Sequence, residues 1–177
     1  QQTTVIVIPT ITLAYDFEKR FREVYETEEP FAWVGTTTDD DRKKLQKRFV
    51  TGEQPILVIT PDSLEQRLRD TIKNAAGAGR LRALVIDEAH LFTQWGRSFK
   101  PQYREMAALR KEILERARSV PGQLGFRTVL LSATVGSAEL QDLHHHFSSP
   151  GPFSVVAANS FRREHDYWVS KQRPPAE

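Results

Sequence analysis

The sequence contains no cysteine, so it can form neither disulfide bonds nor thiolate metal sites. It has no apolar run close to the roughly 18 residues that a membrane-spanning helix requires, and no signal peptide is visible at its start. Neither sign of charge dominates, since 25 basic residues stand against 23 acidic ones and the net charge is +2. That balance neither requires nor excludes a nucleic-acid partner, and any basic surface must be local.

A phosphate-binding loop of the G-x-x-x-x-G-K-[ST] type is also absent, because none of the nine glycines is followed by lysine. The chain begins with Gln1 rather than methionine and runs almost at once into the strand-like stretch VIVIP at residues 5–9. We therefore expect that a segment preceding Gln1 is missing from this sequence.

What the sequence does contain is an alternation of apolar runs and helix-like patterns. Strands are predicted at residues 5–8, 31–35, 55–60, 81–87, 127–133 and 153–158, with a shorter one at 165–170. Helices are predicted at about 13–24, 41–50, 63–76, 101–118 and 137–147. Continuous apolar strands with helices between them predict an α/β fold with a mostly parallel sheet covered on both faces. The ligand site of such a sheet lies at the carboxyl ends of its strands, where Asp87, Glu88, Ser132 and Thr134 fall.

The stretch LVIDEAH at residues 84–90 places two carboxylates at the end of a predicted strand. Asp87 is suited to hold a hard cation such as Mg²⁺, directly or through water. Glu88 can orient or deprotonate an attacking water, and His90 is close enough to couple this site to a neighbouring element. The four letters DEAH alone are weak evidence, because a strand can also end in solvated acids.

Four ordered stretches make the chain resemble the RecQ-like branch of the superfamily-two DNA helicases. VIDEAH at 85–90 runs into the aromatic-rich LFTQWGRSFKPQY at 91–103, as the DExH box of that family does. VIVIPTITLAYD at 5–16 resembles the family's motif Ia, LVITPDSL at 57–64 its motif Ib, and LLSATVGSAELQDL at 130–143 its motif III. Beyond these four, NSFRREHDYWVS at 159–170 resembles the stretch that ends the family's first motor domain.

The resemblance implies a partial RecA-like three-layer domain over residues 1–170, truncated at its N-terminal strand and phosphate-binding loop. Residues 171–177 would link it to a missing second RecA-like domain of the same polypeptide. The implied cofactors are ATP and Mg²⁺, with Asp87 as the Mg²⁺ ligand and Glu88 as the catalytic base. His90, Ser132 and Thr134 would relay the nucleotide state to the DNA side. The implied activity is translocation on single-stranded or partly duplex DNA with strand separation, 3′ to 5′, inside a prokaryotic cytoplasm or a eukaryotic nucleus.

The resemblance also implies DNA contacts in two places. The aromatic-rich loop would sense single-stranded DNA, because aromatic faces stack on any base and basic side chains reach phosphates. Its implied contact residues are Trp95, Arg97, Phe99 and Lys100, and Gln94 would couple DNA sensing to ATP hydrolysis. The loop positions that meet the DNA backbone are Pro9, Thr10, Thr60 and Pro61. The alternatives are that Trp95 and Phe99 form a hydrophobic plug and that the prolines are plain turn residues.

The sequence departs from the family pattern at Leu91, Phe92 and Thr93, where a small or polar run is more usual. Lys100 stands where arginine is common, which keeps the charge but loses the planar fork. Without a phosphate-binding loop, the chain as given is expected not to hydrolyse ATP efficiently. Two other functions stay open: a degenerate helicase domain that serves as a nucleic-acid or protein scaffold, and a double-stranded DNA translocase of a defence system.

A sheet without its first strand has a structural consequence as well. Loss of a central strand leaves an unpaired strand edge and exposed apolar surface. We therefore expect either low stability of the isolated chain or a partner that completes the fold.

Overall fold

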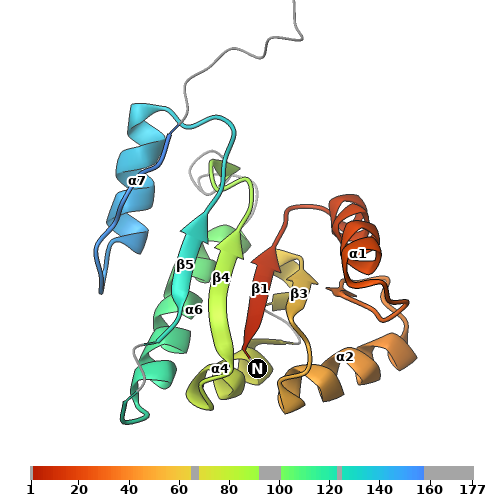
Figure 1. Ribbon diagram of the computed structural model, residues 1–177. Coiled ribbons are helices and arrows are strands. Elements are labelled where there is room, and N and C mark those ends of the chain that lie inside the picture. Colours follow the sequence, from red (N-terminus) through yellow and green to blue (C-terminus); the bar gives the residue numbers. More distant parts are fainter. Residues whose placement is uncertain (1, 65–67, 92–100, 123–124, 158–177) are drawn as a thin grey trace, which may run out of the picture.

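The computed structural model describes residues 2–64, 68–91, 101–122 and 125–157, and within 101–118 it describes side chains from Glu105 onward. The strands form one sheet in the order β2-β3-β1-β4-β5, and every neighbouring pair is parallel (Figure 1). Their bounds are Thr3–Val7 for β1, Ala32–Trp33 for β2, Ile56–Ile59 for β3, Leu81–Ile86 for β4 and Arg127–Leu130 for β5. The predicted parallel α/β fold is confirmed.

Helices follow the strands in the predicted alternation. They are α1 Ile11–Tyr25, α2 Asp39–Thr51, α3 Pro61–Ser63, α4 Arg69–Gly77, α6 Pro101–Arg118 and α7 Ser137–Phe147. Side-chain caps explain two of their starts, because Thr10 accepts a hydrogen bond from the Leu13 amide and Thr38 accepts one from the Asp41 amide. Of the helix predicted at 63–76, the structure has α4 from Arg69 onward, while α3 ends at Ser63, where the predicted helix begins.

Alternate residues of each strand point to opposite faces of the sheet, and each face has its own core. On one face, which we call the α6 face, strand residues pack with side chains from α2, α4, α6 and α7. Strand residues on the α6 face are Val5, Val7, Leu57, Ile59, Leu84 and Ile86. On the other face, which we call the α1 face, Ile8 and Val58 pack with Ala14 of α1 and with the half-buried Phe17 and Phe21. Helices therefore lie on both sides of the sheet, as the sequence predicts.

The α1 face is covered unevenly. Over β1 and β3, Ile8 and Val58 are 0% exposed. On β5, Leu130 packs toward the α6 face, so that Val129 and Leu131 point to the α1 face, where they are 39% and 47% exposed. The apolar surface that the sequence led us to expect thus lies beside β5, which is an edge strand. Its expected consequence for stability stays a prediction.

The strand predicted at 153–158 is wrong for residues 153–157, which have no regular secondary structure. Val155 is 57% exposed and Val156 is 99% exposed. The apolar composition suggested a buried strand, but a strand needs a partner edge for its backbone groups, and none of the described strands pairs with this segment. The shorter strand predicted at 165–170 lies outside the described residues. Within the described ranges, no helix combines the length and apolar character needed to cross a membrane.

Candidate nucleotide-hydrolysis site

Backbone hydrogen bonds connect the segment that follows β4, which begins at Asp87, to β1 on one side and to the segment that follows β5 on the other. The Asp87 amide donates to the Val7 carbonyl at 2.9 Å, and the Leu131 amide donates to the Ile86 carbonyl at 2.9 Å. The Ala89 amide then donates to the Leu131 carbonyl at 2.8 Å. The two segments that follow neighbouring parallel strands therefore meet at the carboxyl edge of the sheet, where a ligand site is expected.

Glu88 lies in the left-handed region of backbone conformation, with φ of 50°. This conformation costs a residue other than glycine roughly 1–2 kcal/mol, and it persists only where the surroundings hold it. Asp87 Oδ1 accepts a hydrogen bond from the Glu88 amide at 2.9 Å, and the Glu88 carbonyl accepts one from the Leu91 amide at 2.9 Å. These bonds turn the chain sharply just after β4 and bring the Glu88 carboxylate to His90.

His90 joins the two predicted motifs. Its Nδ1 lies 3.1 Å from Glu88 Oε2 and 2.9 Å from Ser132 Oγ. An ionised carboxylate can only accept, so we assign a proton to Nδ1. Ser132 Oγ donates its own proton to the Thr134 carbonyl at 3.0 Å, which leaves its lone pairs to accept from His90. The single Nδ1 proton is shared between Glu88 and Ser132, and polar contacts therefore connect Glu88 through His90 and Ser132 to the Thr134 carbonyl.

Asp87 has the chemistry that a magnesium ion needs. One of its oxygens accepts from the Glu88 amide, and the other has no hydrogen-bond partner among the residues that the structure describes. Mg²⁺ is usually held by one or two carboxylates together with waters and phosphate oxygens. The described residues contain no group of three or more histidine or acidic side chains that could hold a metal alone. The residues present therefore fit an Mg²⁺ ion that is shared with a nucleotide.

The predicted DNA-contact residues are placed differently from one another. Thr10 is exposed and caps α1, and Pro9 before it is half-buried. Thr60 is 5% exposed and its hydroxyl lies 3.1 Å from the Ser63 hydroxyl, while Pro61 is buried. The Thr60 hydroxyl thus has a partner within the protein. Five predicted residues lie outside the described residues: Gln94, Trp95, Arg97, Phe99 and Lys100.

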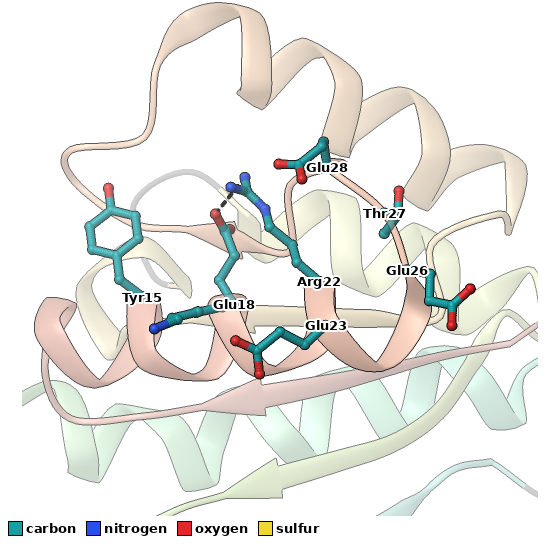
Figure 2. A pocket seen from close by; sticks show the side chains of 8 residues that line it. Tyr15, Glu18, Arg22, Glu23, Glu26, Thr27 and Glu28 are labelled. Atoms are coloured by element: carbon teal, nitrogen blue, oxygen red, sulfur yellow. Dashed lines mark ion pairs between the residues drawn. The ribbon is translucent and has the colours of Figure 1, made fainter.

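A hollow along α1 lies away from this chemistry, and none of the predicted site residues lines it. In Figure 2, Glu18 and Arg22 point toward each other across it, and their ion pair measures 2.8 Å. Glu18 Oε2 also accepts hydrogen bonds from the Phe31 and Ala32 amides. The buried Glu18 carboxylate therefore fastens α1 to β2, which is a structural role.

Sequence reasoning missed two contributors to the site's framework. The Leu131 carbonyl and amide hold the DEAH segment, but a backbone hydrogen bond leaves no signature in the residue type. Arg110 of α6 bonds to Thr128 of β5 and to the Ser149 carbonyl beyond α7. Helical spacing places Arg110 between Met106 and Ile113 on the apolar stripe of α6, unlike the exposed Lys111 and Arg118, and this is the signal that could have found it.

The fold and site together define an α/β domain that carries an Asp-Glu-Ala-His segment at the carboxyl edge of a parallel sheet. The family of DEAD/DEAH box helicases matches residues 1–143, and the chain belongs to that family. ATP use is a property of this family.

RecQ-family DNA helicases are distant homologues over most of the chain. The chain is 25% identical over 168 residues to "ATP-dependent helicase SGS1" of Saccharomyces cerevisiae, covering 94% of this chain and 11% of that protein. It is 26% identical over 178 residues to "RecQ-like DNA helicase BLM" of Xenopus laevis, covering 97% of this chain and 12% of that protein. The chain thus spans only a small part of the length of these relatives.

Solved helicase structures share the fold. A DUF1998 helicase, MrfA, bound to DNA and AMPPNP, matches with a TM-score of 0.64 and 19% identity, covering 89% of this chain and 21% of that one. The DEAD-box helicase Mss116, bound to ssRNA and UDP-BeF, matches with a TM-score of 0.55 and 22% identity, covering 82% of this chain and 28% of that one.

Proposed function

We propose that this chain is part of the motor of a RecQ-like, ATP-dependent DNA helicase. In this proposal ATP hydrolysis drives movement along single-stranded DNA, 3′ to 5′, and separates the strands of a duplex. The observation that carries the proposal is the chain of polar contacts from Glu88 through His90 and Ser132 to Thr134. It links the residue suited to activate water with a segment on the neighbouring strand. The direction of movement, and the intracellular location, are supported by the RecQ resemblance alone.

Each residue has a part in the proposed mechanism. The bound nucleotide with Mg²⁺ supplies the phosphoanhydride bond to be broken, and Asp87 would hold the metal through its second carboxylate oxygen. Glu88 would orient the attacking water and accept its proton. Because His90 Nδ1 contacts both Glu88 and Ser132, a shift of the segment 132–134 would move the Glu88 carboxylate. That linkage would let DNA binding change the rate of hydrolysis.

The phosphates need a cradle that this sequence does not contain. We propose that a segment outside it supplies the phosphate-binding loop and that residues 1–170 form a partial motor domain with a linker at 171–177. A second RecA-like domain of the same polypeptide would complete the ATP site. The exposed Val129 and Leu131, close to Asp87 and Ser132 in the sheet, support an additional covering segment there. The isolated chain would accordingly lack efficient ATP hydrolysis.

DNA is the proposed nucleic acid because RecQ relatives such as "RecQ-like DNA helicase BLM" carry that substrate in their names. The proposed contacts are the exposed Thr10, the loops at Pro9 and at Thr60–Pro61, and the aromatic-rich loop. Since the Thr60 hydroxyl is turned toward Ser63 and Pro61 has no amide hydrogen, a phosphate there would be bound by other groups of the loop.

The test is ATP hydrolysis by the complete protein that contains this chain, with and without single-stranded DNA. We expect DNA to stimulate hydrolysis, and Glu88→Gln to lower the stimulated rate by about 10²–10⁴-fold, the usual contribution of a general base. Glu115→Gln, which changes an exposed carboxylate on α6, is the matched control. DNA binding without any ATPase would instead indicate the scaffold function. Stimulation by closed duplex without unwinding would indicate a double-stranded translocase.

A further inference from the structure

Arg110 is a buried cation that the proposed chemistry does not use. The residue is 6% exposed, and its Nε donates to Thr128 Oγ1 at 2.7 Å while its Nη1 donates to the Ser149 carbonyl at 2.8 Å. Its guanidinium also lies 5.5 Å from the centre of the Phe147 ring. Among the described residues these hydrogen bonds go to neutral oxygens, and burial, followed by the positive charge of Arg118, lowers the pKa of Arg110. Burying a cation with neutral partners is costly, so a core built only for stability would favour an apolar side chain here.

The contacts of Arg110 join both ends of one segment. Thr128 lies in β5 and Ser149 lies just beyond α7, so the residues between them include Ser132, Thr134 and the whole of α7. In Figure 1, β5 and α7 lie next to each other and run in opposite directions, with the connection between them at the carboxyl edge of the sheet. Arg110 therefore joins the start of β5 to the chain just after the end of α7. The connection from β5 to α7, which carries Ser132 and Thr134, lies at the opposite end of both elements.

Among the described residues, α7 is held to the core mainly by two apolar side chains. Leu143 and Phe147 are its buried residues, at 3% and 5% exposure, and its N-cap Gly136 offers no side-chain hydrogen bond. By contrast α6 is anchored through Met106, Ile113 and Leu114. The position of α7 relative to β5 thus depends strongly on the side chain that reaches from α6 to both.

We propose that Arg110 is a positioning residue for the connection that carries Ser132 and Thr134, and that it keeps Ser132 within reach of His90. This rests on the proposed function, because the consequence is the coupling of DNA binding to ATP hydrolysis. Without Arg110 the ends of β5 and α7 separate more freely, the 132–134 segment samples more positions, and Glu88 is held less firmly through His90.

The test uses the complete protein with four variants. Arg110→Met keeps an unbranched side chain and removes the charge and both hydrogen bonds. Arg110→Lys keeps the charge but lacks the planar guanidinium that donates to two oxygens at once. Thr128→Val removes one of the two acceptors and keeps the side-chain shape. Lys111→Met is the control on the exposed side of the same helix. We expect Arg110→Met to lower the DNA-stimulated kcat about tenfold, within the usual range for coupling between sites, with KM for ATP changed by less than about twofold. Arg110→Lys and Thr128→Val should be intermediate, and Lys111→Met should match the wild type.

Amide hydrogen exchange gives the second readout. Exchange in residues 131–148 should rise about tenfold in Arg110→Met, while β1 and β3 keep their protection. Faster exchange with an unchanged stimulated kcat would mean a purely structural role and would overturn the proposal, as would equal behaviour of Arg110→Met and Lys111→Met. If the wild type itself shows no ATPase, the proposed helicase function has failed and the coupling role of Arg110 fails with it, whereas an unchanged stimulated kcat in Arg110→Met beside an active wild type overturns the positioning role alone.

Discussion

Two parts of the α1 face of the sheet differ sharply. Val58 on β3 and Val129 on β5 are the same residue type on the same face, yet Val58 is 0% exposed and Val129 is 39% exposed. Over β3, α1 covers the sheet with Ala14, Phe17 and Phe21. Over β5, Val129 and Leu131 have no comparable cover within the described residues.

The difference teaches where stability and chemistry lie in this domain. The covered half contains a closed apolar core, while the half with exposed side chains adjoins Asp87, Glu88 and Ser132. The exposed side chains there offer a surface for the covering segment proposed above. We therefore interpret the covered half as the framework and the other half as the part that the proposed segment would complete.

The largest expected effect comes from making the same change in both halves. Val58→Ala should lower the free energy of unfolding by about 2–3 kcal/mol, because it removes buried methyl groups and leaves a cavity. Val129→Ala should cost less than about 0.5 kcal/mol, because its side chain is already partly in water. Urea unfolding of the two variants and the wild type measures both values. Equal losses would break the comparison and would mean that another segment covers β5 in solution.

A smaller effect on stability is expected from Glu18, whose carboxylate holds α1 against the framework half of the sheet. Glu18→Gln keeps the shape of the side chain but loses the charge that pairs with Arg22 and accepts from the Phe31 and Ala32 amides. We expect a loss of about 1–2 kcal/mol, since hydrogen bonds to a charged buried group are the stronger ones. Glu23→Gln, on an exposed position of α1, is the control for the same denaturation experiment. A loss no larger than that of the control would show that apolar packing alone holds α1 in place.

Much of the framework could be predicted from the sequence. The apolar runs before Pro9, Thr60 and Asp87 gave strands β1, β3 and β4, because a strand buried on both faces is apolar at nearly every position. That Asp87 and Ser132 follow neighbouring strands agrees with the prediction that both lie at the carboxyl edge. Whether they act as predicted stays a prediction, as do the DNA contacts.

Other features could not be predicted, for physical reasons. Residues 153–157 have the composition of a strand, but pairing depends on which edge is free in three dimensions, and composition carries no such information. Glu88 has positive φ although its residue type favours other conformations, because its amide donates to Asp87 Oδ1 and its carbonyl accepts from the Leu91 amide. Arg110 lies on the apolar stripe of its helix, between Met106 and Ile113, but the sequence does not show what it contacts until β5 and α7 are placed beside it.

The smallest expected effect on stability concerns the α6 face, where helices cover both halves of the sheet. There Glu112 of α6 binds Arg69 and, at 3.1 Å, Lys73 of α4. Hydrogen bonds first from Arg69 and then from Lys73 lower the pKa of Glu112. A lowered folded-state pKa means that the stabilisation is present above the ordinary pKa of a glutamate and is lost as the pH falls through the folded-state value. Glu112→Gln should therefore cost about 0.5 kcal/mol near pH 7, since the side chains are partly exposed, and almost nothing near pH 3. Denaturation of the variant, the wild type and the exposed control Glu115→Gln across this range measures the gap. If the difference in unfolding free energy between the wild type and Glu112→Gln stays constant with pH, packing rather than charge joins α4 to α6. The packing of these helices on the α6 face would then not depend on the ion pairs.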